Sequence, residues 1–463
     1  MTKIGKGLFI FHRDLRLQDN RGLWEASRRC KHLYVCFIFT PEQVGRTNKY
    51  RSNDAIQFMI ECLEELSADI ASKGSKLLIF YGNPVAVVKS VLKHLPLEGV
   101  FFNQDYSPYA VKRDQTVANL CEKQGVECRM FSDYYLYEPG TILSGKEAYK
   151  KYTPFYERVL PENVEPPKGG FIGNLAQPDT SLPNVLPLDK AKEHFVRENA
   201  HILVRGGRKN ALMRLRAALK EQHDYDETRD YFMSNTTFLS AYIKFGCVSI
   251  REVYHAFLKR FGKHHGLIRE LIWREFFAHV LYAYPDVVGQ SYQERYRHLD
   301  WDNNTTRFHA WCEGRTGFPL VDACMRQLNM TGYMHNRGRM TVASFLIKTL
   351  LIDWRWGERY FAQKLTDYDI ASNNGNWQGI SGTGVDMKPY FRDMNPWIQS
   401  RKYDAEAEFI KKWVPELQDV IPVDIHQWHI AHERPEYKGV KYPRPMVDYF
   451  QQKEKMLRMY QDA

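Results

Sequence analysis

The chain has 463 residues, 44% of them apolar, and a formal net charge of +10 with an isoelectric point near 9.0. Length and apolar content are ordinary for a globular protein of about two or three domains. The first residues lack the apolar run of a signal peptide, and no apolar segment is long enough to span a bilayer, so we expect a soluble, intracellular protein. The positive charge favours a polyanionic partner, nucleic acid before an acidic membrane.

The eight cysteines form no CxxC pair. Their scatter fits free thiols in a reducing compartment better than a disulfide scaffold or a zinc site. We therefore expect neither disulfides nor a bound metal.

The first 130 residues alternate between short apolar runs and amphipathic stretches. We expect buried strands at residues 8–12, 33–39, 77–81 and 100–103. Helices are expected at residues 56–70, where the apolar side chains form one stripe, and at residues 85–95 and 109–123. Strand–helix alternation predicts a parallel sheet with helices on its faces. Because no G-x-G-x-x-G follows the first strand, an ordinary dinucleotide site is not expected there.

Proline and glycine interrupt the chain between residues 161 and 190, which predicts a long connector across the surface of one domain. Beyond residue 200 the pattern is helical to the end. We predict an α/β domain over residues 1–130, an interdomain linker over residues 131–200 and a large all-helical domain over residues 201–463.

The segment Asp367–Trp377 combines two acids, two adjacent amides, a glycine and a tryptophan. Acids and amides can hydrogen-bond the polar edge of a heteroaromatic ring, and a tryptophan can pass an electron to it. The combination favours a redox-active ring system over hydrolytic or metal chemistry.

Three other segments of the helical half are unusually rich in polar and aromatic residues. Thr236–Ser240 is a hydroxyl cluster at a helix start, where backbone N–H groups can hold a phosphate, although an ordinary N-cap is the simpler explanation. In the segment Glu270–Glu275, the acid Glu270, the indole of Trp273 and the guanidinium of Arg274 share one helix face. Burying such a face without a ligand is costly. The alternative is an ordinary amphipathic helix with a salt bridge. In His335–Met340 the asparagine and the methionine share a face.

Together these motifs resemble the photolyase/cryptochrome family. The resemblance rests on Arg13–Arg16, Thr236–Ser240, Ile272–Glu275, Met334–Arg337, Asp353–Arg355, Asp367–Trp377 and Pro389–Arg392, in this order along nearly the whole chain. It implies an N-terminal α/β antenna domain and a C-terminal helical domain that binds FAD in a bent conformation, active as reduced FADH⁻. Class I cyclobutane pyrimidine dimer photolyases are the nearest branch.

The resemblance also implies roles for single residues. Positions that match FAD-binding residues of the family are Tyr225, Thr236, Thr237, Leu239, Ser240, Arg274, Glu275, Arg339, Asp367, Asp369 and Asn373. Asn373 matches the residue that faces flavin N5, where asparagine favours a repair enzyme that keeps its flavin reduced. Trp377, Trp354 and Trp301 match an electron-transfer triad that leads from the flavin to the surface.

For the substrate, Glu270, Trp273, Asn336 and Met340 match lesion-contacting residues of class I dimer photolyases. We expect Glu270 and Asn336 to hydrogen-bond the flipped-out lesion, Trp273 to stack on it and Met340 to pack against it. The paired histidines of (6-4) enzymes are absent at the position of His335–Asn336. The implied reaction is that of a lyase: an electron passes from excited FADH⁻ to a pyrimidine dimer, two carbon–carbon bonds break, and the electron returns.

One position departs from the class I pattern. Gly379 stands where those enzymes usually carry a second tryptophan beside the lesion. Its absence removes a stacking surface worth roughly 1–3 kcal/mol. Trp397 is a candidate substitute, and weaker binding or a different lesion are the alternatives.

The expected partner is UV-damaged DNA, bound by a monomeric protein. Basic residues near the lesion motifs are expected to contact phosphates, with a solvated basic face as the alternative: Arg337, Lys388, Arg392, Arg401 and Lys402. An antenna chromophore, a folate or a deazaflavin, is expected where Asn103, Asp105 and Tyr106 end a strand at the ligand edge of the sheet. A cryptochrome-like photoreceptor and a (6-4) or DASH-type photolyase are the alternative functions.

Overall fold

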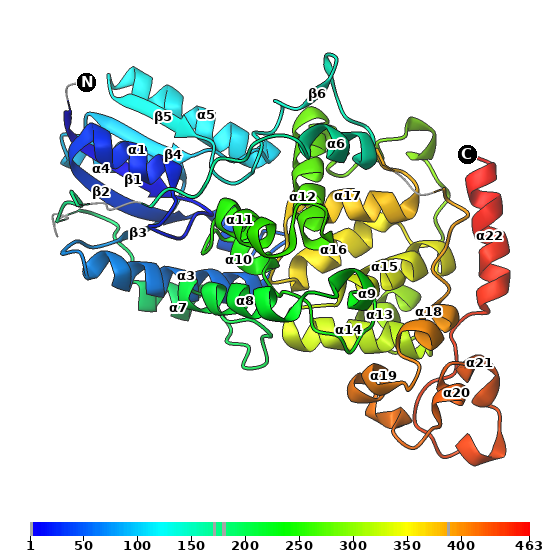
Figure 1. Cartoon of the computed structure of the whole chain (residues 1–463). Helices are drawn as coiled ribbons and strands as arrows, with labels where there is room; N and C mark the ends of the chain where they lie inside the picture. Colours follow the sequence, from blue (N-terminus) through cyan, green and yellow to red (C-terminus); the bar gives the residue numbers. More distant parts are fainter. Residues whose placement is uncertain (1–2, 170–172, 178–181, 387–388) are drawn as a thin grey trace. The chain divides into compact units, whose positions relative to one another are not determined.

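The computed structural model describes the chain except residues 1–2, 170–172, 178–181 and 387–388. The chain divides into two compact units (Figure 1). The first comprises Met1–Asn199, Val204–His223 and Thr237–Pro285, and the second comprises Ala200–Leu203, Asp224–Thr236 and Asp286–Ala463. The domain boundaries expected from the sequence stay a prediction.

A five-stranded parallel sheet forms the centre of the first unit, in the order β3–β2–β1–β4–β5. The strands are β1 Ile4–Phe11, β2 Cys30–Phe39, β3 Leu78–Tyr81, β4 Gly99–Asn103 and β5 Glu127–Phe131. Four of them lie where the apolar runs predicted them. The fifth was not predicted, because its burial is only partial and its sequence alternates weakly. The predicted fold class, an α/β domain followed by a mostly helical chain, is confirmed.

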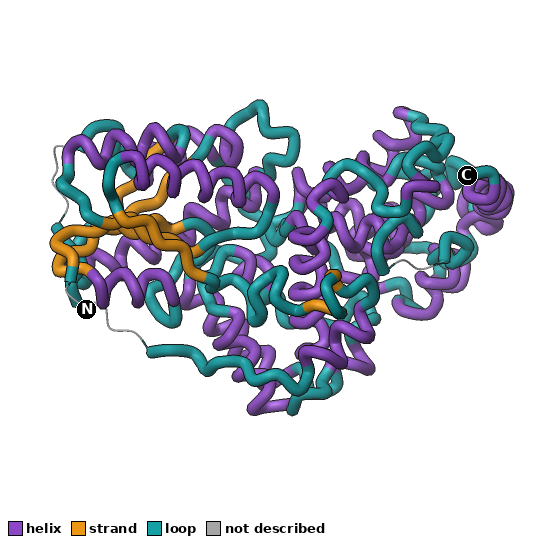
Figure 2. Tube along the Cα trace, turned by 90° about the horizontal axis from the view of Figure 1, so that it is seen from above, coloured by secondary structure: helices purple, strands orange, loops and turns teal. Residues whose placement is uncertain are grey.

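Helices cover both faces of this sheet, as Figure 2 shows. Leu8 and Ile10 share a core with helices α4 (Pro84–His94) and α5 (Pro108–Lys123). Phe9 points to the opposite face, where α1 (Arg21–Arg29) packs. Helix α3 (Asn53–Ala71) carries the predicted apolar stripe, buried as expected. Within this unit the short elements are α2 (Pro41–Val44) and the hairpin strands β6 (Leu143–Ser144) and β7 (Glu147–Ala148).

The proline-rich connector returns to the sheet. Leu175 bridges Leu33 of β2, and Val185 bridges Phe80 of β3. No helix or strand occurs among the described residues between α6 (Tyr152–Val159) and α7 (Leu188–Phe195), as the prolines predict. The later helices of the first unit are α8 (Arg208–Glu221), α10 (Ser240–Lys244), α11 (Ile250–Phe261) and α12 (Gly266–Ala283).

A buried ion-pair network joins α11 to the loops at the end of β1 and β5. The guanidinium of Arg16 lies 2.6 Å from the Asp133 carboxylate, and Arg251 lies 2.7 Å from Asp133 and 2.9 Å from Asp19. Burial alone would raise the pKa of Asp133, but Arg16 and Arg251 hold it below its usual value. All four side chains are almost inaccessible to solvent, so the network fixes the α11–α12 region onto the sheet.

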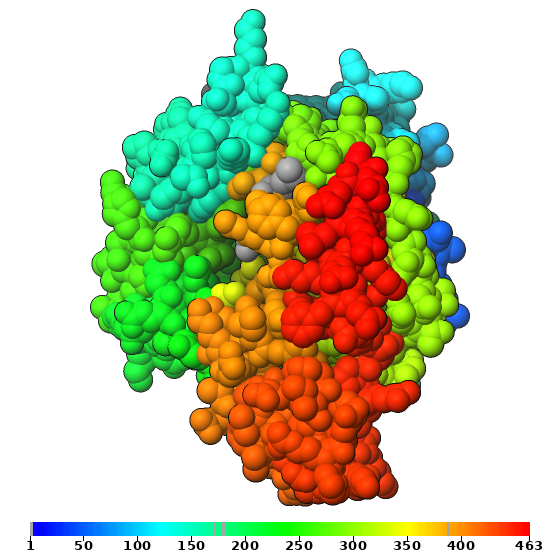
Figure 3. All heavy atoms as spheres, turned by 90° about the vertical axis from the view of Figure 1, so that its right-hand side faces the viewer, coloured from blue at the N-terminus to red at the C-terminus, as the bar shows by residue number. Residues whose placement is uncertain are grey.

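The second unit is helical. Its described α-helices are α9 (Tyr225–Thr228), α13 (Thr305–Glu313), α14 (Pro319–Thr331), α15 (Asn336–Ser344), α16 (Trp354–Lys364), α17 (Ile370–Ser381), α18 (Pro396–Tyr403), α19 (Glu408–Trp413), α20 (Pro422–Ile425), α21 (Trp428–Ala431) and α22 (Tyr449–Gln461). Figure 3 shows α22 along one surface of this unit. Gln452 donates to the Thr349 carbonyl at 2.8 Å and Tyr460 donates to Ser381 at 2.6 Å, which ties α22 to the unit's core.

The eight cysteines are all free, as predicted, and seven of them are buried. Among the helices of the described residues, none is long and apolar enough to cross a bilayer.

A buried acid joins α16 to α17. Glu358 of α16 accepts a hydrogen bond from the Asn374 amide at 2.9 Å, and its backbone carbonyl accepts one from the Asn373 amide at 3.1 Å. Burial raises the pKa of Glu358 to about 7 despite the hydrogen bond from Asn374. The native state therefore binds a proton that the unfolded chain releases at lower pH.

Glu358→Gln should remove a pH dependence of stability. Because the pKa is raised on folding, the Glu358 contribution is fully favourable below the unfolded value near 4.5 and is lost as pH rises to about 7. Above that pH the wild type should be less stable than Glu358→Gln by up to about 3 kcal/mol. The measurement is the free energy of unfolding in urea at pH 5 and pH 8.

Glu454→Gln, on the exposed side of α22, is the control and should follow the wild-type profile. A Glu358→Gln protein whose unfolding free energy falls with pH as steeply as that of the wild type would contradict this account.

Candidate functional site

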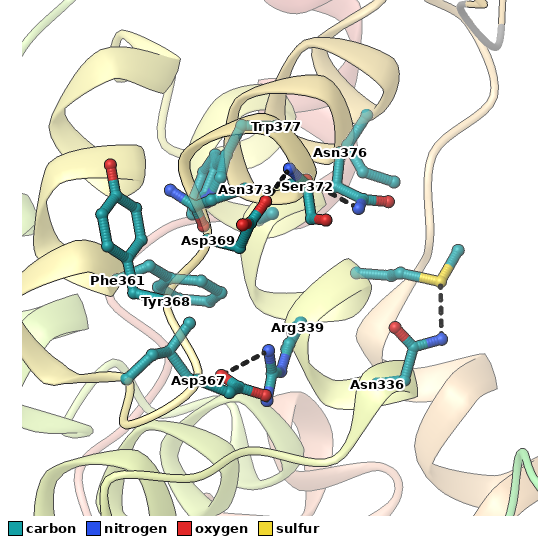
Figure 4. Close-up of a pocket in the computed structure, with 14 residues that line it drawn as sticks. Asn336, Arg339, Phe361, Asp367, Tyr368, Asp369, Ser372, Asn373, Asn376 and Trp377 are labelled. Atoms are coloured by element: carbon teal, nitrogen blue, oxygen red, sulfur yellow. Dashed lines mark hydrogen bonds and ion pairs between the residues drawn. The ribbon is translucent and has the colours of Figure 1, made fainter. Parts of the chain in front are cut away.

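A pocket in the second unit collects residues from α15, α17 and the turn between α16 and α17 (Figure 4). The cavity proper is about 100 Å³, and it opens to solvent. Its polar lining includes Asn336, Arg339, Asp367, Asp369, Ser372, Asn373 and Asn376, and its apolar lining includes Met340, Ala343, Phe361, Leu365, Tyr368, Trp377 and Ile380. Seven residues singled out from the sequence thus line one cavity: Asn336, Arg339, Met340, Asp367, Asp369, Asn373 and Trp377.

An ion pair forms one side of the pocket. Arg339 donates two parallel hydrogen bonds to Asp367, at 3.1 and 2.9 Å, and its Nε donates to the Met334 carbonyl at 2.9 Å. Burial lowers the pKa of Arg339, but the Asp367 carboxylate outweighs that effect and raises it. The bidentate geometry holds a fixed charge pair at the cavity wall.

On the other side, the start of α17 presents Asp369 and Asn373 (Figure 4). Asp369 caps the helix by accepting from the Ser372 N–H at 3.0 Å. The Asn373 amide nitrogen donates to the Glu358 carbonyl, which fixes the orientation of the side chain. A flat ring with a polar edge fits this pocket, because charged and amide groups stand beside aromatic and aliphatic walls.

Trp377, on α17, is buried against α16. Its ring meets Phe361 edge to face, with ring centres 5.0 Å apart. A Cβ atom on Gly357 would lie only 2.2 Å from the Trp377 ring, so the glycine lets the indole rest on the backbone of the helix that carries Trp354. Trp354 is buried in the same core, and Trp301 packs against that core while remaining partly exposed.

Asn336 and Met340 share one face of α15, as predicted from their spacing. The Asn336 amide nitrogen lies 4.0 Å from the Met340 sulfur. His335 caps this helix by accepting from the Arg337 N–H at 3.1 Å.

The candidates on α12 belong to the first unit. Glu270, Trp273 and Arg274 are half-buried, whereas Glu275 is completely buried. Glu275 accepts from the backbone N–H groups of residues 136 and 137, at 2.9 and 3.1 Å, and from Arg274 at 3.2 Å. Burial raises the pKa of Glu275 to about 7. Arg274 also covers the Tyr135 ring at 4.4 Å. Arg274 and Glu275 thus fasten the segment after β5 to α12, and their role toward a flavin stays a prediction.

The hydroxyl cluster divides between the units. Tyr225 and Thr236 lie in the second unit, where the Thr236 hydroxyl is 3.3 Å from that of Tyr333. In the first unit the Thr237 hydroxyl accepts from the Leu239 N–H at 3.3 Å, and Ser240 is exposed at the start of α10. Leu239 itself is buried. The phosphate-binding role of the cluster stays a prediction.

The basic residues expected to contact DNA phosphates differ in their exposure to solvent and in their partners within the fold. Arg337 forms an ion pair with Asp230 and covers the Tyr403 ring at 4.5 Å, so it is engaged within the second unit. Arg392, Arg401 and Lys402 are exposed. Lys388 lies outside the described residues.

The expectation that Trp397 replaces the missing tryptophan is wrong. Trp397 is 8% exposed and lies in the core of the second unit, where its ring stacks on Phe318 with centres 4.7 Å apart. Asn395 caps α18 by accepting from the Trp397 and Ile398 N–H groups, and Pro396 and Ser400 are buried with Trp397.

Three residues at these sites were missed by sequence reasoning. Glu358 orients Asn373, Tyr333 contacts Thr236, and Tyr152 stacks on Trp273. No motif marks them, since each acts on a residue distant in the sequence. No group of three or more metal-ligating side chains occurs among the described residues.

The chain is similar to known proteins over its whole length. Residues 267–462 match the FAD binding domain of DNA photolyase, and residues 8–169 match the DNA photolyase model. Deoxyribodipyrimidine photo-lyase of Halobacterium salinarum is 35% identical over 482 residues, 98% of this chain and 99% of that protein. The Escherichia coli protein of the same name is 36% identical over 484 residues, 98% of each.

Two solved structures extend this similarity to the fold. An archaeal photolyase from Sulfolobus tokodaii with two FAD molecules has a TM-score of 0.89 and 39% identity, over 99% of this chain and 100% of that one. A Synechocystis cryptochrome has a TM-score of 0.90 and 28% identity, over 99% and 100%. Because the two matched models cover most of the chain and the relatives span 98% of it, the chain belongs to the DNA photolyase family and carries its FAD-binding domain.

Proposed function

We propose that this protein is a light-driven DNA repair enzyme, a lyase that splits cyclobutane pyrimidine dimers with the help of reduced FAD. One observation carries the proposal: groups suited to a flavin edge and groups suited to a pyrimidine edge line the same cavity. Arg339, Asp367 and Asn373 are of the first kind, and Asn336 and Met340 are of the second. Electron transfer between two rings requires that they lie close together, and one cavity provides this.

The residues of the pocket fit FAD, which supplies the photoexcited electron donor when bound. Arg339 would supply a positive charge to the polar edge of a bound ring, where a fixed cation would stabilise negative charge without rearrangement. Asp367 holds that guanidinium in place through two hydrogen bonds. Asn373, oriented by the Glu358 carbonyl, keeps its amide at one position beside the ring. Phe361 and Trp377 exclude water from the cavity wall.

The substrate residues act on a pyrimidine dimer that has left the duplex, because the reacting bonds are inaccessible inside the stack. Asn336 supplies amide groups to a base edge, and Met340 supplies a soft apolar surface. Glu270 accepts hydrogen bonds from the pyrimidine N–H groups, and Trp273 provides an indole face for stacking. The exposed Arg392, Arg401 and Lys402 supply positive charge to DNA phosphates.

Gly379 has open space around it among the described residues. A Cβ atom there would meet only the Asp386 carbonyl oxygen, at 3.9 Å. With Trp397 buried, no aromatic side chain identified from the sequence replaces the second tryptophan of class I enzymes. The proposal therefore implies that the lesion is held with less stacking area than in class I enzymes.

A second binding site is proposed in the first unit, at the carboxyl ends of β1, β2 and β4. His12, Thr40, Arg113 and Asp114 line a pocket there with apolar residues of the sheet. Burial, and then Arg113, hold the pKa of His12 well below its usual value, so the ring is neutral. The Sulfolobus tokodaii photolyase contains two FAD molecules and implies a light-harvesting role for one of them. We propose a second FAD here as the antenna, in place of a folate or deazaflavin.

Of the residues expected to mark the antenna site, Asn103 is engaged in the fold. Its side chain donates to Asp14 at 2.6 Å and to Asn20 at 2.8 Å, and it accepts from the Gly22 N–H. Asp105 pairs with Arg13 at 2.8 Å. Tyr106 is buried.

We further propose that the enzyme acts as a monomer, in the cytoplasm or the nucleus of its host.

Glu270→Ala should lower repair while leaving FAD bound. Loss of a charge-assisted hydrogen bond to the lesion should reduce dimer repair about tenfold or more. The measurement is the recovery of thymine from dimer-containing DNA under light, at equal flavin content. Glu157→Ala, on an exposed acid of α6, should repair like the wild type. An undiminished yield for Glu270→Ala would remove this residue from the reaction.

Trp377→Phe should slow the light-driven reduction of oxidised flavin, since phenylalanine is far harder to oxidise than indole. Flavin absorbance should remain largely oxidised after an exposure that fully reduces the wild type. Dimer repair by the chemically reduced variant should persist. Trp413→Phe, which replaces a tryptophan outside the proposed triad, is the control. Photoreduction of Trp377→Phe at the wild-type rate would reject the relay.

The antenna proposal predicts two FAD molecules per chain and one in Arg113→Ala, because that variant loses the cation of the second pocket. Flavin released by denaturation and counted against protein concentration measures this directly. Lys112→Ala, an exposed neighbour, should keep both. One flavin per chain together with a released folate or deazaflavin would overturn the proposal.

A further inference from the structure

Tyr152, the first residue of α6, lies flat against Trp273 of α12. The two ring centres are 3.6 Å apart and the rings are 5° from parallel. Both residues belong to the first unit. Free aromatic pairs prefer offset or perpendicular arrangements to a direct face-to-face overlap. The surrounding structure must therefore impose this geometry.

Two contacts impose it. The Tyr152 hydroxyl donates to the Arg269 carbonyl at 2.9 Å, one turn before Trp273 on the same helix. The Tyr152 ring also meets Phe276 edge on, with centres 6.0 Å apart, and Phe276 in turn meets the Trp273 edge at 5.8 Å. Tyrosine thus binds the helix turn with its hydroxyl and the indole with its ring.

The same tyrosine lies close to the other α12 residue proposed to contact the lesion. Burial, and next the Glu270 carboxylate, raise the pKa of the Tyr152 phenol. Tyr152 consequently stays neutral and keeps donating to the Arg269 carbonyl. One buried side chain therefore borders both Glu270 and Trp273.

Two rings stack on Trp273: Tyr152, and also Phe277 one turn further along α12, whose ring centre lies 5.4 Å from that of the indole at an angle of 28°. Tyr152 is buried and covers one indole face, whereas Trp273 is half-buried. A nucleobase can stack only on a face that the protein does not cover. An indole that rotated freely would offer either face and would lose side-chain entropy on binding.

We propose that Tyr152 is a positioning residue that fixes the plane of Trp273 for contact with an unpaired pyrimidine dimer. The proposal rests on the proposed function and deepens it. A preoriented indole favours binding, because less side-chain entropy is lost when the ligand docks.

The test compares Tyr152→Leu, Tyr152→Phe and, as a matched control from the same segment, Tyr149→Leu. Affinity is measured for an oligonucleotide with one thymine dimer and for its undamaged counterpart, using holoenzyme in the dark. Tyr152→Leu should bind the dimer about three- to tenfold more weakly, with undamaged DNA unaffected. Tyr152→Phe keeps the ring and should restore most of the preference, and Tyr149→Leu should match the wild type.

Repair per bound dimer should stay near the wild-type value in all three variants, since Tyr152 acts on binding geometry. Equal dimer preference in Tyr152→Leu and the wild type would overturn the inference, as would equal weakening for damaged and undamaged DNA. Should Tyr152→Leu fail to fold by thermal denaturation, Tyr152→Met replaces it, because methionine fills irregular space well. A wild type without any preference for dimer DNA would instead reject the proposed function itself.

Discussion

The buried network of Arg16, Asp19, Asp133 and Arg251 is the constraint on which the first unit depends. It joins loops at the carboxyl ends of β1 and β5 to α11. Removing one partner of such a network leaves an uncompensated buried charge, which typically costs about 3–5 kcal/mol. Because α12 follows α11 directly, the network also determines where Glu270 and Trp273 stand relative to the sheet. Tyr152 then fixes the plane of Trp273 within that frame.

The second unit has its own fixed element, the bidentate pair of Arg339 and Asp367. Helix α15 supplies the arginine and the turn before α17 supplies the aspartate, so the pair holds two walls of the pocket together. Glu358 likewise joins α16 to α17: its carboxylate accepts from Asn374, and its backbone carbonyl accepts from Asn373 and orients that side chain. Rigid walls suit electron transfer, since donor and acceptor need a constant separation and little rearrangement on charging. Chemistry in this family is supplied by the cofactor, and the protein supplies this rigidity.

Much of this organisation could be predicted from the sequence. The apolar runs located four strands, since buried parallel strands read as continuous apolar segments. The order of the motifs identified the family and seven residues of one pocket. The predictions that failed depend on tertiary contacts between residues that are distant in the sequence. Nothing in the sequence around Trp397 shows that Phe318 lies against it, and nothing around Arg337 shows its ion pair with Asp230. Glu275 likewise binds a backbone segment that precedes it by 138 and 139 residues.

We propose that the pocket of the second unit brings excited reduced FAD together with a pyrimidine dimer. The most direct measurement is repair by the purified, fully reduced protein, supplied in parallel with DNA carrying one cyclobutane dimer or one (6-4) photoproduct. The account predicts that light restores both thymines of the cyclobutane dimer, that darkness restores none and that the (6-4) photoproduct is unchanged. No restoration of the dimer under light, or restoration of the (6-4) photoproduct in its place, would contradict it.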